Sequence, residues 1–395
     1  MVGKLQPYNN NPNLEHICQT VHVYQSNVES SYDNNHDFTS SVSNQADPAR
    51  VIREALSKAL VYYYPLARKL KKNSDGKLQI NCTADGVPFL VATSNCDLSS
   101  LHYLDGVDVE VTRQFVYDVP SEGDSGCHPL VLQVTKFSCG GFIIGMGLSH
   151  SVCDGFGAGQ FLQALAELAS GKNEPSVKPV WERERLVVTP TEEPFQSPVD
   201  NTSIATSPYF PTTDFMHECF YVSGDSIKRL KMTLMEECGS QNLNESFTTV
   251  EALAAYEGEL NEAPFSKIVK IIKDTKKVAS NSDYIMLSLV VLERFREVNI
   301  KFKAKGALMD FTDWRRLGFL DIDFGWKGPI NIVPVPMNMI GYVDLCMFLP
   351  PSNVYPSKKD GVRVFISLPR AAMAKFKEEM DALKIAGDGT CVSAL

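Results

Sequence analysis

His150-Ser151-Val152-Cys153-Asp154-Gly155 follows a long apolar run, residues 130–149, and precedes a segment with helical periodicity. This order places a histidine at the end of a predicted strand, with an aspartate four residues further on. Imidazole has an unperturbed pKa of about 6.5, so it can take up and return a proton near neutral pH. Gly155 allows a sharp turn before the helix. The stretch therefore predicts a strand–turn–helix unit that presents a candidate general base.

The residues around this stretch predict a mixed α/β fold. Apolar runs at residues 130–134 and 142–148 predict two strands with Gly140-Gly141 as the turn between them, and helical spacing predicts a helix over 156–170 that ends at Gly171. The same reasoning predicts strands at residues 16–23, 78–82, 88–92 and 362–368, and helices at residues 48–63, 265–279 and from Pro369 onward.

Two local motifs add detail to this pattern. Asp85-Gly86 lies between the strands predicted at 78–82 and 88–92, so it predicts a hairpin. Thr248 and Glu251 have the spacing of a capping box, which predicts a helix that continues through Tyr256. A stretch rich in Pro, Ser, Thr and Glu, residues 172–214, predicts a linker between two halves.

Composition limits the class of protein. The chain has 395 residues, 44% hydrophobic and 22% charged, which predicts a globular protein of two domains. Its net charge of −9 and lack of a basic run argue against nucleic acid as the main ligand. No apolar span has the length of a membrane helix, and residues 1–13 are polar without the apolar core of a signal peptide.

The cysteines and histidines predict neither a disulfide framework nor a metal site. The ten cysteines form no CxxC pair, and the seven histidines show no metal-ligand spacing. We therefore expect reduced thiols, a cytoplasmic location and no bound metal. Cys153 is interpreted as a packing residue rather than a nucleophile.

A single HxxxD occurs by chance in many long proteins, so the catalytic interpretation of His150 needs further support. Two other features of the sequence provide it. One is Asp323-Phe324-Gly325-Trp326; the other is the strand 130–137, which leads through Cys139-Gly140-Gly141-Phe142 to His150. Together these residues resemble the BAHD family of plant acyl-CoA-dependent acyltransferases, whose signatures are HxxxDG and DFGWG. The chain matches the first signature in full and the second in four of five places, with Lys327 in place of the last glycine. The resemblance extends to residues 51–60, 62–67, 179–184 and 368–369.

The resemblance implies a fold and a set of partners. It implies two similar chloramphenicol-acetyltransferase-like domains, each a mixed sheet with flanking helices, joined by a long crossover. On this basis, residues 1–171 form the domain that carries HxxxD, residues 172–214 the crossover, and residues 215–395 the domain that carries DFGW. The expected partners are an acyl-CoA co-substrate and a small-molecule amine or alcohol, with no permanently bound cofactor, no nucleic acid and no membrane. The family expectation is a monomer.

Individual residues then take expected roles. His150 is the candidate general base, and attack on the thioester is expected without an acyl-enzyme, since Ser149 and Ser151 are poor nucleophile candidates. Asp154 either orients His150 as a triad acid does or supports the loop, and the resemblance favours the supporting role. Structural support is also expected from the other motif residues: Gly155, Asp323, Phe324, Gly325 and Trp326. Trp314 either lines a substrate pocket or is a packed tryptophan.

The choice of substrate rests on three further stretches. Residues 311–315, 329–336 and 376–380 resemble the spermidine hydroxycinnamoyl transferase branch of the family. This predicts transfer of a hydroxycinnamoyl-type group from coenzyme A to an amine such as spermidine. The alternatives are O-acylation of a terpenoid or alkaloid alcohol, by acetyl or benzoyl transfer, and an inactive shortened family member.

The chain departs from the family pattern in three ways. The DVR-like arginine and the YFGN or YYGN motif are missing, as if a strand-rich piece were excised after Tyr256. We therefore expect a shortened second domain in which Asp154, taken to be buried, has lost its arginine partner. The N-terminal strand of relatives is also expected to be missing. The third departure concerns two motif positions: Lys327 replaces a glycine, and Leu66-Ala67-Arg68-Lys69 replaces the more usual LAGR.

Overall fold

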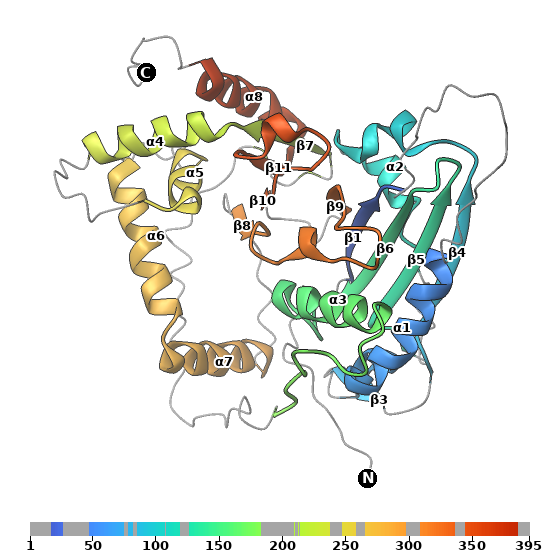
Figure 1. The fold of residues 1–395 in the computed structure, drawn as a ribbon. Coiled ribbons are helices and arrows are strands. Elements are labelled where there is room, and N and C mark those ends of the chain that lie inside the picture. The colour runs from blue at the N-terminus through green and yellow to red at the C-terminus, as the bar shows by residue number, and fades with distance from the viewer. Residues whose placement is uncertain are drawn as a thin grey trace, which may run out of the picture. The chain divides into compact units, whose positions relative to one another are not determined.

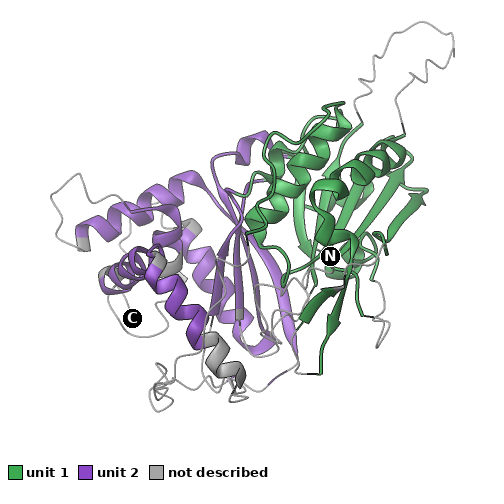
Figure 2. Ribbon diagram, turned by 90° about the horizontal axis from the view of Figure 1, so that it is seen from below, with its two compact units in different colours: residues 1–183, 317–339, 352–354 green, residues 184–316, 340–351, 355–395 purple. Residues whose placement is uncertain are grey.

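The computed structural model of the chain contains two compact units (Figure 2). Unit 1 comprises residues 1–183, 317–339 and 352–354, and unit 2 comprises residues 184–316, 340–351 and 355–395. The structure describes residues 17–26, 47–74, 78–81, 85–106, 108–118, 126–182, 209, 212, 214–237, 247–257, 265–297, 309–335 and 344–385.

Unit 1 is built on a five-stranded mixed sheet in the order β4-β5-β6-β1-β9 (Figure 1). Its strands are β4 (Phe89–Ser94), β5 (Leu130–Phe137), β6 (Phe142–Ser149), β1 (Ile17–Tyr24) and β9 (Asn331–Val335). Only β4 and β5 are parallel; the other neighbours are antiparallel. The predicted strand pair β5–β6 is confirmed, and Gly140 at its turn has a φ of 76°. Every residue of β6 is buried, so this strand runs through the core of unit 1.

Helices cover one side of this sheet. α1 (Pro48–Tyr62) begins at Asp47, whose carboxylate accepts a hydrogen bond from the Ala49 amide, and Pro48 suits the first turn because its missing N–H is not needed there. α3 (Gly155–Ala169) packs against α1, and Figure 1 shows both on the same side of the sheet. The Tyr63 ring lies edge-on to Phe161 of α3, with the centroids 5.2 Å apart. The helices predicted at 48–63 and 156–170 are therefore confirmed.

The other side of the sheet is covered by short elements. These are η3 (Leu98–Leu104) and α2 (Val109–Arg113), capped by Asp108. His102, Tyr103 and Leu104 have positive φ angles, which L-residues adopt at a cost, and the Tyr103 carbonyl accepts a hydrogen bond from buried Asn331 of β9.

The predicted hairpin at Asp85-Gly86 is wrong. β3 (Leu78–Asn81) pairs with β2 (Lys69–Lys72) in a separate two-stranded sheet, whereas β4 pairs in parallel with β5. Gly86 does have a φ of 75°. Glycine is favoured at this positive φ, but the strands on either side of Gly86 belong to different sheets.

Unit 2 contains a four-stranded sheet in the order β7-β11-β10-β8. The strands are β7 (Phe215–Val222), β11 (Val362–Pro369), β10 (Asp344–Leu349) and β8 (Met309–Asp313), and only β10 and β8 are parallel. The helices are α4 (Gly224–Glu237), α5 (Thr249–Glu257), α6 (Phe265–Ala279), α7 (Ser282–Glu297) and α8 (Arg370–Ile385).

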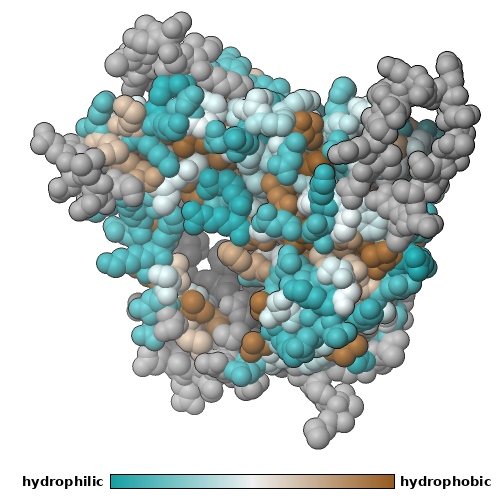
Figure 3. Space-filling view, in the orientation of Figure 1, coloured by the Kyte–Doolittle hydropathy of each residue, from teal (hydrophilic) through white to brown (hydrophobic). Residues whose placement is uncertain are grey.

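In unit 2, one helix start was predicted from a local sequence motif and one helix was missed. The capping box is confirmed: the Thr248 amide donates to Glu251 Oε2 at 2.9 Å, and the Glu251 amide donates to Thr248 Oγ1 at 3.2 Å. α7 was not predicted. Its residues Tyr284, Ile285 and Leu287 are 43%, 39% and 59% exposed, and Figure 3 shows hydrophobic residues on its surface. α7 therefore adds little to the core of unit 2 among the described residues.

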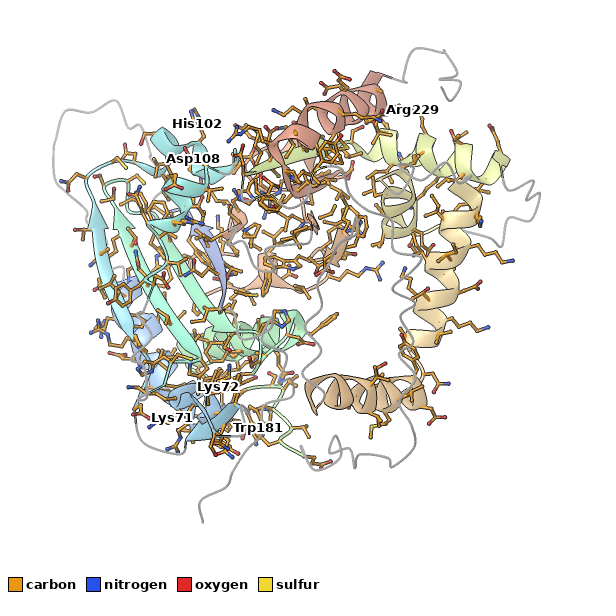
Figure 4. All side chains as sticks on the ribbon, turned by 180° about the vertical axis from the view of Figure 1, so that it is seen from behind. Lys71, Lys72, His102, Asp108, Trp181 and Arg229 are labelled. Atoms are coloured by element: carbon orange, nitrogen blue, oxygen red, sulfur yellow. The ribbon has the colours of Figure 1, made fainter. Side chains whose placement is uncertain are left out.

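The chain returns to unit 1 after β8. Residues 317–339, which carry Asp323–Trp326, cluster with unit 1, although the sequence analysis assigned them to the C-terminal domain. The reason is strand pairing, since β9 lies antiparallel to β1 with Val333 opposite Val21. The boundary between residues 183 and 184 falls inside the predicted linker. Trp181, labelled in Figure 4, holds the end of unit 1's first segment to α1, because its Nε1–H donates to the Tyr62 carbonyl at 3.2 Å.

Candidate functional site

His150 lies in a tight turn between β6 and α3. The Ser149 carbonyl accepts hydrogen bonds from the amides of Val152 and Cys153, at 3.0 and 3.3 Å, so the turn is short and closed. His150 is half-buried, whereas Ser149 and Ser151 on either side are each only 1% exposed. Within the described part of the chain, no hydrogen bond engages the imidazole ring. The ring is thus accessible, while its serine neighbours are not.

Asp154 caps α3. Its Oδ1 accepts a hydrogen bond from the Gly157 amide at 2.8 Å, which satisfies one of the free N–H groups at the start of the helix. Asp154 is exposed, so the expectation of a stranded buried carboxylate is wrong. An exposed carboxylate needs no buried ion pair to hold it. Gly155 is the first residue of α3, directly after this cap.

Asp323-Phe324-Gly325-Trp326 forms a turn that packs its two aromatic rings into unit 1. Phe324 and Trp326 are 3% and 6% exposed. Phe324 lies edge-on to Tyr24 with centroids 6.0 Å apart, and Trp326 lies edge-on to Phe142 at 5.3 Å. The turn is closed by Asp323, whose Oδ1 accepts a hydrogen bond from the Gly325 amide at 2.7 Å. Gly325 has a φ of 99°, which favours glycine.

Tyr24 and Phe142 are the residues of this cluster that the sequence analysis did not assign. They lie opposite each other in the β1–β6 pairing, and their rings stack at 4.8 Å. The Tyr24 hydroxyl donates to the Ile322 carbonyl at 3.1 Å. Burial, and to a lesser extent the charge of Asp323, raise the pKa of Tyr24 well above its usual value, so the hydroxyl remains a donor. In the sequence, only the aromatic residue type at the last position of β1 and the first position of β6 could have pointed to this cluster.

Lys327 adopts a left-handed backbone conformation, with a φ of 65°. A side chain with a Cβ is disfavoured there, and the lysine is exposed. We expect Lys327→Gly to raise the free energy of unfolding by about 1 kcal/mol, since glycine adopts this φ without strain. Urea denaturation followed by circular dichroism measures the change. Lys327→Ala keeps the Cβ and serves as the control; an equal gain from alanine would refute the backbone explanation.

His22 is a second imidazole in unit 1, fully buried in β1. Its Nε2 lies 3.1 Å from Thr20 Oγ1, its ring is edge-on to Phe319 at 5.4 Å, and its Nδ1 has no hydrogen-bond partner in the described structure. Burial lowers the pKa of His22 to about 4. This histidine is therefore neutral at pH 7 and acts in packing, not in proton transfer.

The buried state of His22 predicts a pH dependence of stability. In the unfolded chain the imidazole gains a proton near pH 6.5, whereas in the folded chain it does so only near pH 4. The stability that neutral His22 provides is complete above pH 6.5 and is lost as the pH falls towards 4, with a slope of about 1.4 kcal/mol per pH unit. We expect His22→Gln to remove this part of the slope in urea denaturation at several pH values. His102→Asn, which removes an exposed imidazole, should leave the slope unchanged.

Trp314 lies in unit 2, directly after β8. Its amide donates to the Phe348 carbonyl at 2.8 Å, and the residue is half-buried. Beside it, Arg315 donates two hydrogen bonds to the Asp313 carboxylate, from Nε and Nη2, each at 2.8 Å. Desolvation pushes the pKa of Asp313 up, but the hydrogen bonds and charge of Arg315 outweigh it, and the pKa is lowered. The structure thus gives Trp314 a rigid support without assigning it to a pocket.

One pocket of about 330 Å³ lies in unit 2, and it contains none of the predicted site residues. Tyr221, Ser223, Ser226 and Arg229 line it, and Arg229 (labelled in Figure 4) donates to Ser226 Oγ at 3.0 Å. Among the described residues, no group of three His, Cys, Asp or Glu side chains could hold a metal ion. No helix in the described part of the chain has the length and apolar character needed to cross a membrane.

Comparison with known proteins agrees with this architecture. A family model described as the transferase family matches residues 13–257 and 254–383. The chain is 38% identical to the spermidine coumaroyl-CoA acyltransferase of Arabidopsis thaliana, over 96% of this chain and 91% of that protein. It is also 38% identical to the spermidine sinapoyl-CoA acyltransferase of the same plant, over 96% and 93% of the two chains.

Solved structures share the fold at lower identity. Vinorine synthase superposes with a TM-score of 0.65 at 18% identity, over 97% of this chain and 98% of that chain. TRI101 of F. graminearum, complexed with ethyl coenzyme A, superposes with a TM-score of 0.69 at 13% identity, over 97% and 99%. The family match and the relatives show an acyltransferase. The chain belongs to the transferase family of BAHD acyltransferases, which use acyl-CoA.

Proposed function

We propose that this chain transfers a hydroxycinnamoyl-type acyl group from coenzyme A to an amine such as spermidine, with His150 as the general base. The observation that carries the substrate class is the 38% identity, over 96% of the chain, to two enzymes named as spermidine acyltransferases. Relatives named for O-acyl transfer, such as the taxadien-5-alpha-ol O-acetyltransferase of Taxus chinensis, are 29% identical over 86% of the chain. An amine acceptor is therefore favoured over an alcohol.

The reaction needs a free lone pair on the acceptor. A primary amine with a pKa near that of lysine, about 10.4, is mostly protonated at pH 7. The neutral fraction of the amine, whose extra proton has gone to the solvent, is the nucleophile, and His150 takes a further proton from its nitrogen as that nitrogen attacks the thioester carbonyl carbon. The tetrahedral adduct then collapses, the C–S bond breaks, and the imidazolium returns its proton to the coenzyme A sulfur. The products are an amide and free coenzyme A, and the histidine ends in its starting form.

Transfer without an acyl-enzyme fits the neighbours of His150. Ser149 and Ser151 are each 1% exposed, so their hydroxyls cannot reach a substrate without rearrangement. Burial, followed by the nearby charge of Asp154, raises the pKa of Cys153 to about 12. The thiol is therefore protonated at neutral pH and is a poor nucleophile. His150 is left as the reactive group of this turn.

Supporting roles are assigned to the remaining motif residues. Asp154 caps α3 and Gly155 starts it, while Asp323–Trp326 anchors residues 317–330 to the sheet through Tyr24 and Phe142. For Trp314 the proposal keeps a place in the substrate pocket, with a packed tryptophan as the alternative. A cytoplasmic location, a monomeric state and binding of acyl-CoA only during turnover are carried over from the family resemblance, and the similarity to a TRI101 structure complexed with ethyl coenzyme A supports the co-substrate.

A shortened second domain is part of the proposal. The match to the family model breaks at residues 254–257, where the sequence analysis places the missing piece after Tyr256. The alignment with the Arabidopsis coumaroyl enzyme spans 437 positions, more than the 395 residues of this chain. The break in the family match and the longer alignment both favour an alternative function: an inactive family member that retains the fold.

A coenzyme A release assay separates these candidates. Purified protein that melts cooperatively is supplied with coumaroyl-, sinapoyl-, acetyl- or benzoyl-CoA, each with spermidine or a hydroxylated terpenoid. Release dependent on spermidine and a hydroxycinnamoyl-CoA supports the proposal, and release dependent on the alcohol supports O-acylation. Failure with every pair favours the inactive candidate. In that case, insertion of the relative's aligned segment after Tyr256 should restore turnover. Continued inactivity would contradict the proposed enzyme function.

A further inference from the structure

The first turns of α3 contain an unusual number of glycines. Gly155, Gly157 and Gly159 occupy alternate positions in the first five residues of the helix. Glycine is among the least favourable residues inside a helix, so a physical reason is needed at each position. The Cys153 sulfur explains Gly157, because an added Cβ would lie 2.6 Å from it.

The other two glycines form a contact surface for Leu317. A Cβ on Gly155 would lie 2.9 Å from Leu317 Cδ1, and a Cβ on Gly159 would overlap the Leu317 carbonyl oxygen. The obstruction at Gly159 is backbone, so it cannot move aside as a side-chain tip can. Phe319, which is 3% exposed and contacts the His22 ring, continues this packing. Residues 317–319 therefore lie directly against the start of α3.

This contact bears on His150 because the intervening turn is short. β6 ends at Ser149 and α3 begins at Gly155. The Ser149 carbonyl accepts from two amides of the turn, and Asp154 caps the helix. The pairing of β6 with β1 and β5 fixes one end of the turn, and the Leu317 contact fixes the other. A shift of α3 would therefore displace His150.

We propose that Gly159 and Leu317 are positioning residues. Their contact fixes where α3 begins relative to β6, and so places the His150 imidazole for proton transfer. The inference rests on the proposed role of His150. Misplacement of a catalytic group by about 1 Å can cost on the order of 10²-fold in rate. Gly159→Ala should push the Leu317 backbone away from α3 and lower kcat by about 10- to 100-fold, with the KM for acyl-CoA changed by less than about threefold.

The test combines kinetics with an observation that does not need turnover. In protein with ¹³C-labelled histidine, the His150 imidazole signal is assigned by its absence from His150→Ala. Gly159→Ala is expected to shift that signal, whereas Gly106→Ala should not. Gly106 is exposed and an added Cβ there meets no atom within 4 Å, so it is a matched glycine control. Thermal melting reports any loss of folded protein separately.

Leu317→Ala provides a second variant that adds no atoms. It should lower kcat by several-fold, and its effect should be less than additive with that of Gly159→Ala if both act through the same contact. An unshifted His150 signal, or unchanged kcat in both variants, would overturn the positioning role. If His150→Ala itself keeps full activity, the proposed function fails instead. If Gly159→Ala does not fold, Leu317→Ala alone decides the question by the same two readouts.

Discussion

Replacement of Trp326 by alanine is expected to lower the free energy of unfolding of unit 1 by about 3–5 kcal/mol. The indole is 6% exposed and lies edge-on to Phe142, whose ring in turn stacks on Tyr24. Alanine would leave a cavity among rigid rings, which cannot close fully, and would also remove a favourable aromatic pair. The tetrad joins residues 317–330 to strands far away in the sequence, so the loss would also loosen this segment.

Urea denaturation followed by far-ultraviolet circular dichroism measures this effect. Trp314→Ala is the matched control, because that indole is only half-buried and lies in unit 2. A smaller loss is expected for the control. If Trp326→Ala cost less than about 1 kcal/mol, the tetrad would not be the anchor described here.

Elements whose signal is local could be predicted from the sequence. The strand pair β5–β6, the helix α3 and the Thr248–Glu251 capping box all follow from periodicity or spacing within about 20 residues. The turn that carries His150 follows from the same local reasoning, since it lies between a buried strand and a helix with one apolar face. The last helix is also found, with Met373 and Met380 each 1% exposed.

Features that depend on distant pairing could not be predicted. β1 pairs with both β6 and β9, and nothing in Val21 or Val333 alone reveals that they face each other. For the same reason the tetrad was assigned to the wrong unit, and a hairpin was predicted where β4 instead pairs with β5. The buried state of His22 likewise depends on residues distant in the sequence, among them Ile144 and Ile332 on the neighbouring strands and Phe319, whose ring lies edge-on to the imidazole.

The largest effect on activity is expected from His150→Ala. Positioned general-base catalysis typically contributes about 10²–10⁴-fold, and kcat should fall by that factor. The KM for acyl-CoA should change little, because the imidazole acts on the acceptor. Since His150 is half-buried in a surface turn and its ring makes no hydrogen bond within the described structure, the variant should fold as the wild type does. Thermal melting verifies this.

Asp154→Asn distinguishes the two roles considered for the aspartate. Asparagine caps a helix about as well as aspartate, so a supporting role predicts little loss of stability or of kcat. A triad acid behaves differently, because asparagine imposes the wrong imidazole tautomer and costs about 10⁴-fold. The exposed carboxylate bonded to the Gly157 amide predicts the first outcome. A loss of the second size would place Asp154 in the proton-transfer machinery.

The most direct measurement is the rate of coenzyme A release from a hydroxycinnamoyl-CoA in the presence of spermidine, with equal amounts of folded wild-type and His150→Ala protein. The wild type should release coenzyme A at least about 100 times faster than the variant. Equal rates for the two proteins would contradict the assignment of His150 as the general base.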